Sequence, residues 1–175
     1  DQVSDLHFTP TEQTRKNLLR EGFSPDTIHV TGNTVIDALL EIVKRDDLKA
    51  PDGVEDKLLP ERKLVVVTAH RRENFGEPFD NICNALTDLS EKYASSIQIV
   101  YPVHPNPHVK DRAYELLGSV KNIILTDPME YLPFVRLLNR ADLILTDSGG
   151  IQEEAPSLGV PVLVLRESTE RPEGL

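Results

Sequence analysis

Residues 143–154 read Leu-Ile-Leu-Thr-Asp-Ser-Gly-Gly-Ile-Gln-Glu-Glu, an apolar run that ends in a glycine pair and continues as a helical pattern. A strand, a glycine turn and a helix in that order leave the first backbone N–H groups of the helix without acceptors. These groups and the positive end of the helix dipole favour a phosphate or another anion. A tight turn whose glycines only relieve backbone strain would give the same pattern, so the rest of the chain has to decide between the two.

Apolar runs alternate with helical patterns through most of the chain. Strands are expected at residues 64–68, 97–101, 123–125, 143–145 and 160–165. Helices are expected at 79–93 and 131–139, from the end of the loop 103–107 to residue 117, and after the glycine pair. Strands that are apolar on both faces and alternate with helices are typical of a parallel sheet covered on both sides. The pattern therefore predicts a doubly wound, Rossmann-like α/β sheet.

The chain falls into three segments. Residues 1–43 carry two short strands and two helices, and we expect them to be an interdomain segment and the end of an amino-terminal domain that this chain lacks. Residues 44–62 are charged and contain Pro51, Gly53 and Pro60, which predicts a linker. Residues 63–175 form the α/β domain. Because the chain starts without Met and stops after a polar cluster, we expect a piece of a longer protein, truncated at the end of this domain.

Composition restricts the class of protein. With 39% hydrophobic and 27% charged residues, the 175-residue chain is ordinary for a globular protein. A formal net charge of −10 disfavours nucleic acid and anionic membrane surfaces as partners. The lone cysteine, Cys83, is expected to be a buried helix residue. Without an apolar stretch of about 18 residues or a leader, we expect a cytoplasmic protein with no membrane span.

Polar residues gather where the strands end. In a parallel sheet the carboxyl ends meet at one edge, which is where ligands bind. The residues after the strands are 70–74 (His-Arg-Arg-Glu-Asn), 104–107 (His-Pro-Asn-Pro), 127–128 (Asp-Pro), 147–150 (Asp-Ser-Gly-Gly) and 166–171 (Arg-Glu-Ser-Thr-Glu-Arg). Four arginines and two histidines make this edge locally basic in an acidic protein, which suits a phosphorylated ligand.

Other chemistries have little support in the sequence. His104 and His108 have a four-residue spacing, but the prolines between them prevent the helix that would align them on a metal, so no metal site is expected. No P-loop or G-x-G-x-x-G motif is present, and we expect no cofactor. A Ser148–His70–Asp147 hydrolase lacks the G-x-S-x-G elbow.

Several of these stretches together resemble a known family. They are residues 30–37 (VTGNTVID), 68–74 (TAHRREN), 103–107 (VHPNP), 131–134 (YLPF), 147–156 (DSGGIQEEAP) and 166–173 (RESTERPE). They are similar to the carboxyl-terminal portion of the non-hydrolysing UDP-N-acetylglucosamine 2-epimerases of bacteria. The resemblance implies half of a two-domain, glycosyltransferase-B-like enzyme, a homodimer at full length. It would interconvert UDP-N-acetylglucosamine and UDP-N-acetylmannosamine for surface polysaccharide synthesis, through elimination and re-addition of UDP.

The resemblance also implies roles for single residues. His70 would be the catalytic residue near the diphosphate or sugar, although a histidine that caps a loop would fit the same position. The residues Ser148, Gly149 and Gly150 would bind phosphate. One helical turn further on, Glu154 would take the ribose hydroxyls. Arg171 would pair with the diphosphate, with an ion pair to Glu170 or Glu173 as its competing role.

Two further assignments follow from the family. Phe134 and the segment from Met129 to Tyr131 would flank the uracil, while Phe134 could equally be part of the helix core. Arg72 with His104 could belong to the regulatory UDP-N-acetylglucosamine site of some bacterial members, or both could be structural loop residues.

The acid-base carboxylates of the family lie in its amino-terminal domain, so we expect this chain alone to be inactive. Three other functions stay open. A UDP-sugar glycosyltransferase could share the fold, a hydrolysing 2-epimerase would release free N-acetylmannosamine, and a non-enzymatic sensor would return the UDP-sugar unchanged.

Overall fold

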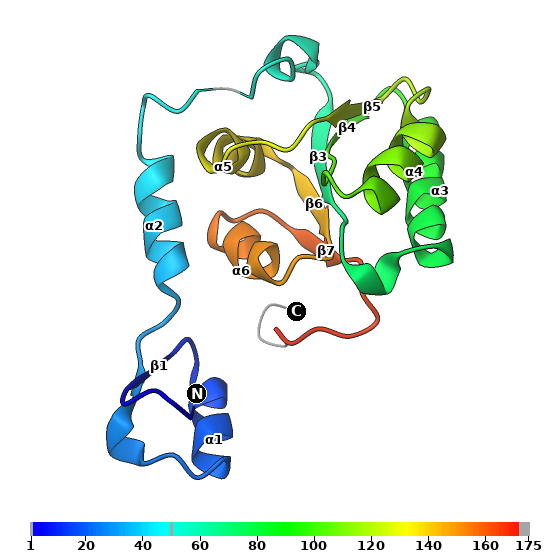
Figure 1. The fold of residues 1–175 in the computed structure, drawn as a ribbon. Helices are drawn as coiled ribbons and strands as arrows, with labels where there is room; N and C mark the ends of the chain where they lie inside the picture. Colours follow the sequence, from blue (N-terminus) through cyan, green and yellow to red (C-terminus); the bar gives the residue numbers. More distant parts are fainter. Residues whose placement is uncertain (1, 50, 172–175) are drawn as a thin grey trace. The chain divides into compact units, whose positions relative to one another are not determined.

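The computed structural model describes residues 2–49 and 51–171. The chain divides into two compact units between Leu39 and Leu40. Figure 1 shows the elements of both units. The end of the last family motif, Pro172 and Glu173, lies outside the described residues.

The first unit is built around a short pair of parallel strands. Its elements are β1 (His7–Thr9), α1 (Glu12–Arg20), the 3-10 turn η1 (Pro25–Thr27), β2 (Ile28–Val30) and the start of α2 (Thr34–Val43). The hydroxyl of Thr11 accepts a hydrogen bond from the N–H of Thr14 at 3.2 Å and so caps α1. A threonine at this position satisfies one of the open N–H groups at the helix start.

The second unit contains the predicted sheet. Its strands are β3 (Lys63–Thr68), β4 (Ile97–Pro102), β5 (Ile123–Thr126), β6 (Leu143–Thr146) and β7 (Val162–Val164). Its helices are α3 (Glu77–Lys92), α4 (Pro107–Leu117), α5 (Tyr131–Arg140) and α6 (Gly149–Ser157), with 3-10 turns η2 (Glu55–Lys57) and η3 (Arg72–Asn74). All strands run parallel in the order β5-β4-β3-β6-β7, which confirms the doubly wound α/β fold.

The strand order reverses beside β3. The chain winds outward from β3 through β4 to β5, and then returns to β6 and β7 on the other side. Figure 1 shows α3 and α4 on one face of the sheet and α5 and α6 on the other. Ligands of such sheets bind where the order reverses, at the carboxyl ends of the two central strands. Here that point lies between β3 and β6.

The core explains why β3 is apolar without interruption. Val65 and Val67 belong to the cluster under α3 and α4, whereas Leu64 and Val66 belong to the cluster under α5 and α6. A central strand covered on both faces needs apolar side chains at every position. Cys83 of α3 is fully buried, as expected, and burial raises the pKa of its thiol to about 12.

Two segments differ from what the sequence pattern suggests. β7 is shorter than the predicted strand 160–165, and Leu163 is 57% exposed because β7 is the edge of the sheet. In the segment expected to be a linker, Val54 is fully buried in the core beside α5. Gln98 of β4 fastens the same segment, since its side chain accepts from the Leu59 N–H at 2.6 Å and donates to the Lys57 carbonyl at 3.0 Å. Within the described residues, no helix is long and apolar enough to cross a membrane.

Candidate functional site

The candidate site lies at the carboxyl ends of β3 and β6. These strands are in register up to the pair Thr68 and Thr146, whose hydroxyls lie 2.5 Å apart in the core. The loop after β3 and the glycine turn after β6 therefore leave the sheet as neighbours. Both loops carry residues that the sequence assigns to function.

Asp147 joins these two loops. Its side chain is fully buried, and Oδ2 accepts hydrogen bonds from the backbone N–H groups of His70 and Arg71, each at 2.8 Å. Oδ2 also accepts from Nδ2 of Asn74 at 2.9 Å. Asn74 in turn donates to the Leu165 carbonyl at 3.2 Å, so the loop after β7 is tied to the same place. The Asp147 carboxylate thus links the chain segments that follow β3, β6 and β7.

His70 lies at the reversal point, in the loop directly after β3. Its Nδ1 is 3.7 Å from Oδ1 of Asp147, and its ring stacks on the ring of His104 with 5.1 Å between centroids. Burial lowers the pKa of His70, and the charges of His104 and Arg71 lower it further, while Asp147 opposes them. The imidazole is therefore mainly neutral near pH 7 and can accept a proton or a hydrogen bond.

The glycine turn begins α6 as predicted. Ser148 is the residue before the helix, and its side chain does not cap it. A β-carbon on Gly149 would lie 3.3 Å from Oε1 of Glu170, 3.6 Å from Nη2 of Arg71 and 3.9 Å from Cζ of Arg171. Two guanidinium groups therefore come close to the helix N-terminus, where the backbone also favours an anion. At Gly150 a β-carbon would meet open space.

Glu154 lies one turn into α6, on the same helix as the glycine turn. It is only 7% exposed, and the hydroxyl of Tyr131 donates to its Oε1 at 3.5 Å. Burial raises the pKa of Glu154. The structure thus brings together Tyr131 and Glu154, which are far apart in the sequence.

Arg171 pairs with Glu170, one of the two partners that the sequence offered, and also with a partner that the sequence did not offer. It bonds to the carboxylate of Glu153 in α6, and Oε1 of Glu170 is further away at 4.0 Å. Thr169 strengthens this attachment, because its hydroxyl donates to Oε1 of Gln152 at 2.5 Å. Glu153 was available only through the tertiary fold, since it lies 18 positions before Arg171.

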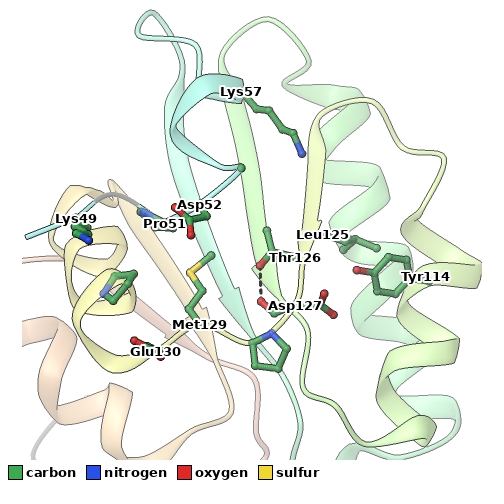
Figure 2. Close-up of a pocket in the computed structure, with 13 residues that line it drawn as sticks. Lys49, Pro51, Asp52, Lys57, Tyr114, Leu125, Thr126, Asp127, Met129 and Glu130 are labelled. Atoms are coloured by element: carbon green, nitrogen blue, oxygen red, sulfur yellow. Dashed lines mark hydrogen bonds between the residues drawn. The ribbon is translucent and has the colours of Figure 1, made fainter.

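Met129 and Phe134 have different surroundings. Met129 lines a pocket of about 700 Å³ at the end of β5, and Figure 2 shows its side chain extending toward Asp52. Lys49 and Lys57, from the segment expected to be a linker, line the same pocket. Phe134 is half-buried and packs against the core cluster under α5 and α6. Of the two roles that the sequence allows for Phe134, this packing is the core role.

Arg72 and His104 lie in the loops that follow β3 and β4. His104 is exposed and stacks on His70, and its Nδ1 accepts from the Asn106 N–H at 3.1 Å. Arg72 is exposed in η3. Of these two neighbouring arginines, Arg71 reaches the glycine turn, although the sequence pattern did not single it out. The only signal for Arg71 was its place directly after His70 at a strand end.

The fold and the residues at its reversal point define a Rossmann-like α/β protein with a histidine and two arginines beside a helix N-terminus. A family model described as UDP-N-acetylglucosamine 2-epimerase matches residues 1–175. The chain belongs to this family. Its relatives include the Escherichia coli K12 protein named UDP-N-acetylglucosamine 2-epimerase, which is 56% identical over 176 residues, 97% of this chain and 46% of that protein.

Solved structures agree with this assignment. The UDP-GlcNAc 2-epimerase of Neisseria meningitidis, bound to UDP-GlcNAc, has a TM-score of 0.90 and 47% identity over 98% of this chain and 47% of its own. The Methanocaldococcus jannaschii enzyme, in complex with UDP-GlcNAc and UDP, has a TM-score of 0.81 and 36% identity over 99% of this chain and 48% of its own. The chain spans about half the length of the relatives that it matches.

Proposed function

We propose that this chain is the UDP-binding part of a non-hydrolysing UDP-N-acetylglucosamine 2-epimerase. The whole enzyme interconverts UDP-N-acetylglucosamine and UDP-N-acetylmannosamine. It acts in the cytoplasm as a homodimer, and its amino-terminal half is not part of this chain. Family membership supports the proposal, together with one observation. Arg71 and Arg171 approach the N-terminus of α6 at Gly149, beside His70.

The diphosphate binds at the glycine turn. The first N–H groups of α6, the Ser148 hydroxyl and the two guanidinium groups all favour negative charge. A diphosphate that enters here replaces the Glu153 carboxylate as the partner of Arg171. Because charge-assisted hydrogen bonds contribute roughly 1.5–3 kcal/mol each, these contacts are enough to hold a nucleotide without a metal ion.

The ribose and the uracil bind at the same end of the sheet as the diphosphate. Glu154, held by Tyr131, accepts hydrogen bonds from the ribose hydroxyls. Met129 contacts the uracil from the pocket at the end of β5, and Phe134 supports that segment from the core. Arg72 and His104 are candidates for a second, regulatory nucleotide-sugar site, and their exposure supports that role.

The reaction needs a stabilised leaving group. Elimination breaks the C1–O bond to UDP, removes the C2 proton and leaves a C1=C2 double bond, and UDP then adds back with protonation of the other face. Contacts that are stronger to the departing diphosphate than to the bound sugar nucleotide lower this barrier. His70, neutral and next to the diphosphate, is placed to exchange a proton or to hold the departing group.

The experiment uses the full-length protein with UDP-N-acetylglucosamine in deuterated water. We expect UDP-N-acetylmannosamine with deuterium at C2. Free N-acetylmannosamine with UDP would instead indicate a hydrolysing enzyme. Transfer of the sugar to an acceptor without C2 exchange would indicate a glycosyltransferase, and unchanged UDP-sugar would indicate a sensor. Each of these three outcomes would overturn the proposal.

A further inference from the structure

The carboxyl group of Asp147 is buried in the core, and only one of its two oxygens accepts hydrogen bonds. It is fully buried, and all three of its hydrogen-bond donors, the N–H groups of His70 and Arg71 and the amide of Asn74, bond to Oδ2. The second oxygen, Oδ1, is buried and has no hydrogen-bond partner among the described residues. Its nearest ionisable neighbour is Nδ1 of His70 at 3.7 Å.

A purely structural role explains the hydrogen bonds of Oδ2 but not the burial of Oδ1. Fastening the two loops requires one acceptor oxygen, and the side-chain oxygen of an asparagine would supply it. A buried carboxylate costs several kcal/mol unless its charge is used by a partner, and a buried oxygen without a donor requires an explanation. The group in reach that can donate to Oδ1 is the imidazole of His70, if its proton is on Nδ1.

The other groups that face His70 cannot replace Asp147. His104, after β4, stacks on the ring, and Arg71 belongs to the same loop. Both of these neighbours and burial lower the pKa of His70, while Asp147 alone among them raises it. Among these groups, Asp147 is the one that favours a proton on the imidazole.

We infer that Asp147 is a positioning residue for His70: its Oδ1 holds the imidazole proton on Nδ1 and leaves Nε2 as the basic nitrogen that faces the reaction. When Nε2 takes a proton, the carboxylate stabilises the charged imidazolium. The catalytic part of this inference rests on the proposed function. The tautomer of His70 does not, because it is a property of this chain without ligand.

The test is the protonation state of His70 in the 15N-labelled 175-residue chain, measured by two-bond 1H–15N NMR without nucleotide. The His70 signals are assigned by their loss in His70→Gln. In the wild type we expect the proton on Nδ1. In Asp147→Asn the amide oxygen keeps the loop bonds and its NH₂ faces Nδ1, so the proton should move to Nε2. The midpoint of the His70 titration should fall by about one pH unit.

Asp142→Asn is the matched control. Asp142 precedes β6 at the other end of the strand, where its carboxylate pairs with Lys63 and the Leu64 N–H. The control removes the same charge from the same strand, so the tautomer and titration of His70 should stay as in the wild type. A wild-type His70 with its proton on Nε2 would overturn the inference, even if Asp147→Asn does not fold.

The second readout is the full-length enzyme. Asp147→Asn should lower kcat about 100-fold with little change in KM, and should move the acid limb of the pH profile to lower pH. A loss of folded protein with an unchanged pH profile would mean that Asp147 only fastens the loops. If the tautomer is as expected but no epimerisation occurs, the proposed function fails and the His70–Asp147 pairing stands.

Discussion

The hydroxyls of Thr68 and Thr146 lie 2.5 Å apart at the last paired position of β3 and β6. The same strand ends are joined once more, because the N–H of Asp147 donates to the Thr68 carbonyl at 3.1 Å. These bonds fix where each strand releases its loop. Because of this register, the histidine loop and the glycine turn start side by side.

Arg71 is expected to carry much of the affinity for the diphosphate. Arg71→Ala should weaken UDP binding about 10- to 100-fold, as the loss of one charge-assisted contact predicts. Isothermal titration of the chain with UDP measures this. Lys121→Ala, an exposed cation at the amino end of β5, is the control and should bind like the wild type. Equal affinities for Arg71→Ala and the wild type would remove Arg71 from the site.

Glu154 is expected to recognise the ribose and to make binding depend on pH. Glu154→Gln should weaken UDP binding about tenfold and narrow the preference for UDP over 2′-deoxy-UDP. The ionised carboxylate accepts hydrogen bonds from the ribose hydroxyls better than the neutral carboxyl group does. Since burial raises the pKa of Glu154, wild-type affinity should decline as the pH falls through that raised pKa.

Titrations with both nucleotides across the acid range measure the effect of Glu154. The variant should lack the acid step, because glutamine does not titrate. An identical pH dependence in wild type and variant would contradict the ribose role.

Gly149 and Gly150 should respond differently to alanine. Neither has a positive φ, so alanine is allowed by the backbone at both positions. Gly150→Ala adds a methyl group in open space and should raise the free energy of unfolding by about 0.5–1 kcal/mol. Gly149→Ala should gain less or lose stability, because its β-carbon would lie 3.3 Å from Glu170. Urea denaturation compares the two, and the opposite ranking would show that the turn is packed differently.

The 175-residue chain alone is expected to be inactive. It spans 46% of the Escherichia coli relative, and the acid-base carboxylates of the reaction are expected in the other half. Incubation with UDP-N-acetylglucosamine in deuterated water should give no deuterium at C2 by mass spectrometry. The full-length protein is the positive control. Any exchange by the chain alone would show that His70 and its neighbours suffice for the proton chemistry.

Much of this site could be predicted because its signals are local. The apolar run before Asp147, the glycine pair and the helical pattern after it place Ser148 and Gly149 at a helix start without any tertiary information. Glu154 follows from the helical period of the same stretch. Arg171 and Phe134 were predicted with two roles each, since an ion pair or a core contact depends on what other segments bring to them.

The linker expectation shows the limit of such patterns. Val54 is flanked by Asp52, Gly53, Glu55 and Asp56 in a stretch with weak periodicity, yet its side chain is fully buried. Similarly, the sequence does not distinguish Arg71 from Arg72, since both are arginines that follow the same strand. In the structure the Arg71 N–H donates to Asp147 and the Arg71 guanidinium lies near the glycine turn, whereas Arg72 is exposed.

The sequence by itself determined the alternation of strands and helices, the glycine turn that begins α6, and the family motifs at the strand ends. Local period and backbone preference are enough for these, because they act between residues a few positions apart. The tertiary structure alone decided that Asp147 faces His70, that Tyr131 meets Glu154 and that Arg171 pairs with Glu153. Those contacts depend on strand order and register, which bring together side chains that sequence distance separates.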